Sequence, residues 1–213
     1  DEEEDEDEEE DEEEDEEDAA ATGDDAMEVD PSTGALTEPT KMAVDEETPV
    51  DDPQPGLDEI EWFAALDLIA AECPTPTADG ISRYLFSELG FAGNREAYYD
   101  WRNSCLDRVI ATRTGIPISL SILMIEVGRR LGVELQGVGM PAHFLVKAAD
   151  SDSVFFDPFD GGRQLNRLQA RELFESITRG QAPWSESHLD PTPNRAIVIR
   201  MLNNLKISMR AKL

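Results

Sequence analysis

Residues 113–147 read RTGIPISLSILMIEVGRRLGVELQGVGMPAHFLVK, and residues 155–162 read FFDPFDGG. The first half of this stretch predicts a helix, because Pro117 suits a first helical turn and Gly132 suits the position just after a helix end. The apolar run from Ile118 to Val127 covers almost the full circumference of that helix. Since a helix that is apolar on all sides is buried, we expect this one at the centre of a domain.

The period of the sequence changes after Gly132. Short apolar and β-branched runs follow (VELQGVGM, HFLVKAA and SVFFDPF), separated by Pro141 and by the polar turn from Asp150 to Ser153. These runs predict an antiparallel meander of three strands, and DPFDGGR then predicts a turn. Helical patterns are predicted at residues 57–72, at about 77–89, within 97–113, at 166–178 and from about 193 onward. The sequence therefore predicts an α+β domain.

The acidic charge is concentrated at one end of the chain. Residues 1–59 hold 30 acidic and 1 basic side chain, whereas the remainder holds 18 acidic and 17 basic ones. Residues 1–18 are unbroken Asp and Glu, whose repulsion and lack of apolar groups predict disorder. The stretch up to residue 56 shows no helical or strand period and is interpreted as linker. We therefore expect a disordered tail and linker over 1–56 and one domain over 57–213.

Composition limits the other classes of protein that fit this chain. Cys73 and Cys105 are too few for a disulfide framework and have no Cys or His at metal-ligand spacing, so we expect a reducing, cytoplasmic compartment and neither metal nor cofactor. No run reaches the length of a membrane span, and no secretory signal is present. The chain begins at Asp1 without Met, which leaves a removed organellar targeting segment open.

Four motifs from the opening stretch occur in an order and spacing that resemble the SirB-type transglutaminase-like family. They are Gly-Ile-Pro at 115–117, Arg-Arg-Leu-Gly at 129–132, Pro-x-His-Phe at 141–144 and Asp-Pro-Phe at 157–159. The family is related by fold to transglutaminases and papain-like cysteine enzymes. The resemblance covers roughly residues 60–210 and implies a central buried helix packed on a small antiparallel sheet, with flanking helices.

Active members of the wider superfamily use a Cys at the start of the central helix, a His on one strand and an Asp on the next. The resemblance places His143 and Asp157 at the second and third positions. A thiolate is stabilised by a helix amino terminus, the imidazole moves the proton, and the carboxylate orients the imidazole. Three interpretations of His143 remain open: a structural partner of Asp157, a retained binding site without catalysis, or a catalytic base. Asp157 is also compatible with simple turn initiation before Pro158.

The position that corresponds to the catalytic Cys of active members has no nucleophilic side chain in this chain. In active members a Cys lies fifteen residues before the Gly that ends the helix, and counting back from Gly132 reaches Pro117. Ser119 is about 200° further around the helix and Ser121 is one turn deeper, so neither is placed to replace a thiol. Cys105 is the remaining candidate nucleophile, although a lone Cys on an apolar helical face is usually a small buried hydrophobe.

These observations favour a non-catalytic transglutaminase-like interaction domain with a residual cleft formed by His143 and Asp157, which is structural or binds a peptide. One alternative is a cysteine-type hydrolase or transamidase that uses Cys105 with His143 and Asp157. A second alternative assigns function to the acidic tail, as a chaperone or adaptor for basic proteins. We expect a protein or peptide partner, with neither direct nucleic-acid nor membrane binding.

The last helix carries five basic residues and no acid from Arg195 onward, with apolar residues at helical spacing. Because the resembling family often continues from such a helix into helical repeats, we expect the domain to be truncated before them. The basic side of this helix is alternatively a site for an anionic partner or for the acidic tail of the same chain.

Overall fold

The computed structural model describes residues 29–30, 35–36 and 59–210 of the 213. Within these ranges the α-helices are α1 Glu59–Glu72, α2 Ala78–Ser82, α3 Leu106–Thr112, α4 Pro117–Leu131, α5 Arg167–Thr178 and α6 Asn194–Arg210. The π- and 3₁₀-helical turns are η1 Arg83–Glu88, η2 Trp101–Ser104, η3 Pro158–Asp160 and η4 Glu186–Leu189. None of these described helices is both long and apolar enough to cross a membrane.

The main sheet has four antiparallel strands in the order β5-β6-β7-β8. Its strands are β5 Leu135–Met140, β6 His143–Ala148, β7 Phe155–Asp157 and β8 Arg163–Leu165. Two short ladders accompany it: β3 Ala92–Gly93 pairs in parallel with β4 Thr114–Gly115, and β1 Val29–Asp30 pairs antiparallel with β2 Ala35–Leu36. The domain is thus α+β, as the sequence predicts.

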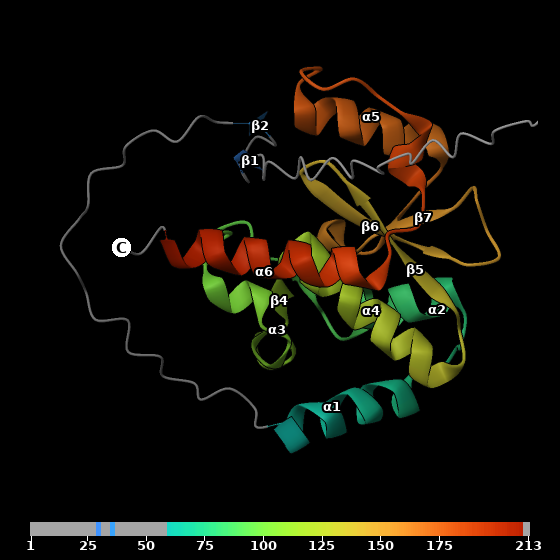
Figure 1. Ribbon diagram of the computed structural model, residues 1–213. Helices are drawn as coiled ribbons and strands as arrows, with labels where there is room; N and C mark the ends of the chain where they lie inside the picture. The colour runs from blue at the N-terminus through green and yellow to red at the C-terminus, as the bar shows by residue number, and fades with distance from the viewer. Residues whose placement is uncertain (1–28, 31–34, 37–58, 211–213) are drawn as a thin grey trace, which may run out of the picture.

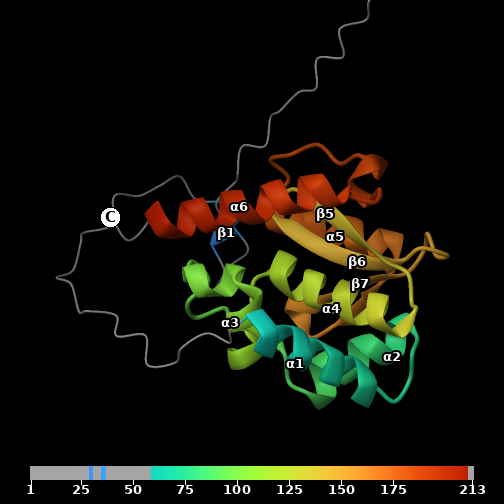
Figure 2. The same ribbon diagram turned by 60° about the horizontal axis from the view of Figure 1, so that its bottom comes forward.

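The sheet lies between two clusters of buried hydrophobic side chains. On one face, Val146 and Phe156 pack with α4 and with residues of α1 and α2. On the other face, Leu145 and Phe155 pack with α5. Successive strand residues point to opposite faces, so neighbouring side chains of β6 enter different cores. The resulting layers are α1 and α2, then α4, then the sheet, then α5 (Figures 1 and 2).

The central helix agrees with its prediction. In α4 the side chains of Leu120, Leu123, Met124 and Val127 are completely buried. Pro117 is the first residue of the helix, and Gly132 ends it in a left-handed conformation with φ of 72°. Glycine adopts this conformation without the steric cost that a Cβ atom adds.

The structure adds detail to several of these predictions. The DPFDGGR segment forms the predicted turn, in which η3 is followed by two glycines, and only its last residue belongs to β8, a strand that the sequence does not predict. The helical pattern predicted within 97–113 corresponds to α3, and the short η2, which the sequence does not predict, precedes it with an extended Cys105 between the two. The helix predicted at 57–72 is α1, which buries Leu66 and Ala70 along a narrow stripe and leaves Phe63 exposed. Finally, β1 and β2 lie in the predicted linker, whereas the acidic run 1–18 lies outside the described residues.

Candidate functional site

His143 and Asp157 lie on neighbouring antiparallel strands. His143 is the first residue of β6 and Asp157 is the last residue of β7. The Nε2 atom of His143 lies 3.0 Å from Oδ1 of Asp157. Both residues are buried, with exposed fractions of 7% and 1%. The structure therefore brings together the two residues that the sequence pairs, in a largely enclosed position.

The carboxylate of Asp157 is held by several donors. In addition to the imidazole, Oδ1 accepts hydrogen bonds from the main-chain N–H groups of Phe159 (3.1 Å) and Asp160 (3.2 Å), so Asp157 caps η3. Burial raises the pKa of Asp157. The charge and hydrogen bond of His143 lower this pKa, as do the Asp160 N–H group and the charge of Arg163, and together they outweigh the effect of burial. The group is therefore an anion at neutral pH, and it fixes the orientation of the His143 ring.

The second ring nitrogen of His143 does not take part in the contact with Asp157. Nδ1 makes no hydrogen bond with residues 59–210. When the imidazole is neutral and Nε2 donates its hydrogen to the anionic Asp157, Nδ1 carries a lone pair. The site thus presents a hydrogen-bond acceptor.

Aromatic rings surround this imidazole. The ring of Phe159 packs edge-on against His143, with centroids 6.2 Å apart, and Tyr98 packs edge-on against the same Phe159 ring at 5.8 Å. The guanidinium of Arg95 lies over Phe159, 4.8 Å from the ring centroid. Gly93 makes this packing possible, because a Cβ atom there would lie 2.5 Å from the Phe159 ring. Burial raises the pKa of Tyr98 to about 12, so its phenol keeps its proton at neutral pH.

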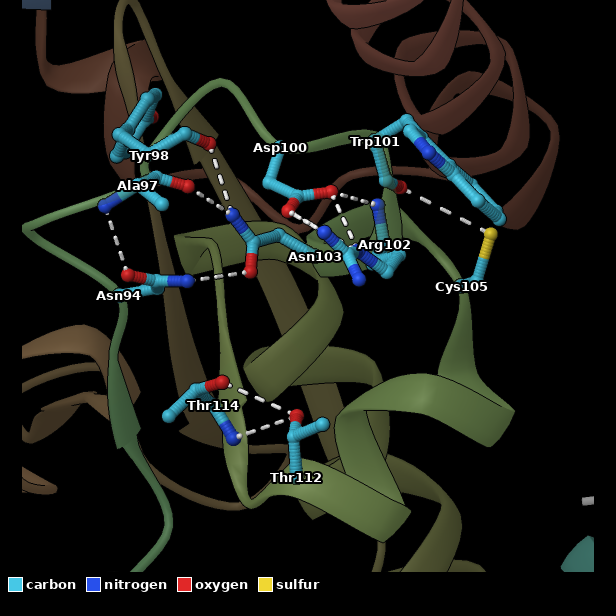
Figure 3. Close-up of polar contacts among 10 residues, drawn as sticks. All are labelled: Asn94, Ala97, Tyr98, Asp100, Trp101, Arg102, Asn103, Cys105, Thr112 and Thr114. Carbon is cyan, nitrogen blue, oxygen red and sulfur yellow. Dashed lines mark hydrogen bonds and ion pairs between the residues drawn. The ribbon is translucent and has the colours of Figure 1, made fainter. Parts of the chain in front are cut away.

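The loop that carries Tyr98 is fixed by Asn103 (Figure 3). The buried side-chain amide of Asn103 donates to the carbonyls of Ala97 (2.7 Å) and Tyr98 (3.0 Å) and accepts from Asn94 at 3.0 Å. The main-chain carbonyl of Asn103 in turn accepts a hydrogen bond from the Ser119 hydroxyl at 2.7 Å. These bonds tie the loop to the first turns of α4. Nothing in the sequence pattern predicts this arrangement.

The start of α4 presents no nucleophile. Pro117 occupies the first helical position and has neither an N–H group nor a reactive side chain. Ser119 donates to the carbonyl of Asn103, and Ser121 donates to the carbonyl of Pro117 at 2.8 Å. Both hydroxyls are completely buried and used structurally. The expectation that neither serine replaces a thiol is consistent with these contacts.

Cys105 is not joined to the His143 site. It precedes α3, and its sulfur contacts the carbonyl of Trp101 at 3.8 Å (Figure 3). No hydrogen bond connects the Cys105 sulfur with the imidazole among the described residues. Burial and the nearby charge of Asp107 raise the pKa of this thiol, which is opposite to what a nucleophilic thiolate requires.

Arg200 is a site residue that sequence reasoning missed. From α6 its Nη2 atom donates to the carbonyls of Met140 (2.8 Å) and His143 (3.0 Å), which flank the turn between β5 and β6. In that turn Ala142 has a positive φ of 62°. The only available signal was the basic character of the last helix, which does not distinguish Arg200 from its neighbours. Within the described part of the chain, no group of three His, Cys, Asp or Glu side chains is arranged to hold a metal ion.

Comparison with known proteins gives a consistent assignment. The sequence model described as the transglutaminase-like superfamily matches residues 56–203. A UPF0162 protein of Xylella fastidiosa is 46% identical over 129 residues, which cover 59% of this chain and 46% of that protein. A UPF0162 protein of Vibrio cholerae is 30% identical over 191 residues, covering 87% of this chain and 67% of the relative.

A more distant relative belongs to a longer protein. F-box only protein 21 of Mus musculus is 36% identical over 115 residues, which cover 50% of this chain and 18% of that protein. The chain spans about half the length of the Xylella relative that it matches. No solved structure matches the chain.

Proposed function

Because the chain belongs to the transglutaminase-like superfamily, we propose that its domain is a non-catalytic interaction domain in which His143 and Asp157 bind a peptide. The observation that carries the proposal is Pro117 at the first position of α4, where active relatives are expected to present a Cys. An imidazole that is oriented by a carboxylate can move a proton, but it has no thiol or hydroxyl to activate at that position.

Two further observations support the absence of catalysis. The hydroxyls in the first turns of α4, those of Ser119 and Ser121, already donate to main-chain carbonyls. The Cys105 sulfur contacts Trp101, and its raised pKa keeps it as a thiol. The alternative of a cysteine-type hydrolase or transamidase would need this thiol beside His143, and the contacts of Cys105 do not favour it.

The remaining chemistry suits a peptide amide. The lone pair at His143 Nδ1 accepts from an amide N–H, and the protonated phenol of Tyr98 donates to a carbonyl. Both rings pack against Phe159, which supports the proposal that the two groups act together. A ligand group that offers one donor and one acceptor, as each peptide unit does, complements this pair.

Catalysis is tested by incubating the protein with amine donors, acyl-donor peptides and thiol-directed probes. We expect no turnover. Turnover that His143→Ala abolishes would overturn the proposal, because it would show that the imidazole serves a working nucleophile. The control is His188→Ala, since His143 and His188 are the only two histidines in the chain. The His188 ring packs between Phe174 and Trp184, away from Asp157.

Binding is tested separately by nitrogen NMR of the two imidazoles in the full chain. N-methylacetamide, which has both a donor and an acceptor, is expected to shift the His143 Nδ1 resonance more than N,N-dimethylacetamide, which lacks the donor. The His188 resonances serve as the internal control. Equal shifts with both amides, or shifts at His188 alone, would contradict a binding role for His143.

We also propose the acidic tail as a site for basic proteins, because 30 of the 48 acidic residues lie in residues 1–59. Pull-down with histones at low and moderate salt tests this second role. Capture by the full chain that falls with salt and disappears on deletion of residues 1–56 is expected. Capture that survives the deletion would assign the binding to the domain instead.

A further inference from the structure

The outer side of α6 exposes a stripe of apolar side chains. Val198, Leu202 and Met209 are 53%, 60% and 55% exposed. At about 100° per residue these three positions lie within roughly 40° of one another around the helix. The helix itself is firmly seated, because Ile197 and Ser208 on its inner side are buried. Figures 1 and 2 show α6 as a long helix along one side of the domain.

Three cations border this stripe on one side. The same helical geometry places Arg195, Lys206 and Arg210 in a neighbouring arc of roughly 60°, beside Val198 and Leu202. All three are exposed, and α6 contains no acidic residue. The fourth cation of the helix, Arg200, is turned inward to the carbonyls of Met140 and His143. We call the stripe and its three bordering cations the α6 face.

The cations of the α6 face lack the acidic partners that other cations of the domain have. Arginines such as Arg95, Arg130 and Arg167 form ion pairs with carboxylates at 2.6–3.1 Å. In contrast, neither Arg195 nor Arg210 has a hydrogen bond or ion pair within residues 59–210, and Lys206 reaches only the amide oxygen of Asn203 at 3.4 Å. The domain holds nearly equal numbers of acids and bases, whereas α6 holds four bases and no acid.

From this arrangement we propose that the α6 face docks an amphipathic helix of a partner protein whose apolar stripe is bordered by acidic residues. The apolar stripe provides the contact area, and acids beside the partner's stripe pair with Arg195, Lys206 and Arg210. A partner helix of similar length to the 17 residues of α6 spans about 25 Å. The proposal is independent of the His143 site.

Two other occupants fit the charges less well. A second copy of α6 brings more cations and no acid, so self-association gains nothing at the basic border. An anionic lipid surface attracts the three cations, but it presents anionic groups on both sides of the apolar stripe, whereas α6 carries its exposed cations on one side only. A protein helix can match the one-sided charge pattern, which favours this occupant.

The test uses the full chain and two synthetic helical peptides that share one leucine stripe. One peptide carries glutamates beside the stripe and the other carries lysines at the same positions. We expect the glutamate peptide to bind more tightly by at least about tenfold, with a difference that shrinks as salt increases. Lys206→Glu/Arg210→Glu is expected to reverse this preference.

The control Arg83→Glu/Arg171→Glu changes the net charge by the same amount on other exposed helices and is expected to keep the preference for the glutamate peptide. Leu202→Ser is expected to weaken binding of the glutamate peptide, which separates the stripe from the charges. Circular dichroism of each variant checks that the fold is retained.

Several outcomes would overturn the proposal. Equal binding of the two peptides, or a preference that Lys206→Glu/Arg210→Glu leaves unchanged, would show that the cations do not select the partner. A dimer of the wild-type chain that Leu202→Ser dissociates would assign the face to a second copy. Binding to phosphatidylserine vesicles in place of either peptide would assign it to a lipid surface.

Discussion

The guanidinium of Arg200 donates a hydrogen bond to the main-chain carbonyl of His143 at 3.0 Å. This bond links the last helix of the domain to the strand residue whose ring faces Asp157. The same Nη2 atom also binds the carbonyl of Met140 at 2.8 Å, so one cation holds both sides of the turn at Ala142. The position of the imidazole therefore depends on α6 as well as on the sheet.

Arg200→Ala is expected to destabilise the protein by about 2–3 kcal/mol, because it removes two hydrogen bonds from a charged donor to buried main-chain carbonyls. Urea unfolding measures the loss. The control is Arg195→Ala on the exposed side of the same helix, for which we expect less than about 0.5 kcal/mol. Equal losses for the two variants would show that the bonds to the turn contribute nothing specific.

Asp157→Ala is expected to cost about 3 kcal/mol or more, because it leaves the imidazole and two main-chain N–H groups without their acceptor. Asp157→Asn keeps an oxygen at this position and is expected to cost roughly 1 kcal/mol. Asp160→Asn is the control, since Asp160 forms exposed ion pairs with Arg95 and Arg163. A loss for Asp157→Ala no larger than that for Asp160→Asn would mean that the buried pair is not a structural element.

The lowered pKa of Asp157 predicts a pH dependence with a definite sign. A carboxyl whose pKa is lower in the folded state stabilises the fold fully above its unfolded pKa of about 3.9 and loses this contribution as pH falls through the folded value. The stability difference between the wild type and Asp157→Asn should therefore be largest above pH ~5 and shrink as the pH falls below about 3.9. Unfolding by urea at several pH values measures it, and a constant difference would contradict the assignment.

The sequence contains enough information to predict the central helix and the pairing of His143 with Asp157. The run from Ile118 to Val127 is apolar on all sides, and its ends carry Pro117 and Gly132, so both the burial and the bounds of α4 could be predicted. Residues 150–153 form a polar turn between two apolar runs, which requires antiparallel neighbours. Both features depend on local chemistry that a single sequence displays.

The surroundings of the site depend on tertiary contacts that the hydrophobic periodicity of the sequence does not indicate. Asn103 reaches the carbonyls of Ala97 and Tyr98 only because the loop folds back on itself, and any polar residue looks equivalent in the sequence. Arg200 differs from Arg195 only in the side of α6 that it occupies, which depends on how the helix docks. Tertiary packing, rather than propensity, therefore determines what lies around His143.

Cys105 is expected to react more slowly with a thiol-directed disulfide reagent than a free cysteine does, because burial and Asp107 raise its pKa. Asp107→Asn removes one of the raising charges, so it should accelerate the reaction at neutral pH. Glu134→Gln, a carboxylate that is not among the groups acting on Cys105, is the control. The measurement uses a Cys73→Ser background so that only the Cys105 thiol is followed. A reaction rate that falls when His143 is replaced by Ala would instead indicate that His143 activates the Cys105 thiol.

Pro117→Cys tests whether the first residue of α4 occupies the position at which active relatives are expected to carry the nucleophilic Cys. The introduced thiol lies at the first position of a 15-residue helix, where the helix dipole favours the thiolate. If this position faces His143, the imidazole adds to the effect, so alkylation near neutral pH should be fast and should slow on addition of His143→Ala. Ultraviolet absorbance of the thiolate, followed against pH in a Cys73→Ser/Cys105→Ser background, reports the pKa.

Arg167→Cys provides a comparison for the helix dipole, because Arg167 is the first residue of α5. Since Arg167 is exposed and Pro117 is buried, the response of each thiol to His143→Ala is compared rather than the absolute rates. Its thiol should gain only the effect of the helix dipole, and its reactivity should not respond to His143→Ala. A thiol at position 117 whose reactivity also does not respond to the loss of the imidazole would mean that Pro117 does not occupy the nucleophile's place. In that event the absence of a Cys there would say nothing about catalysis, and the non-catalytic interpretation would lose its main support.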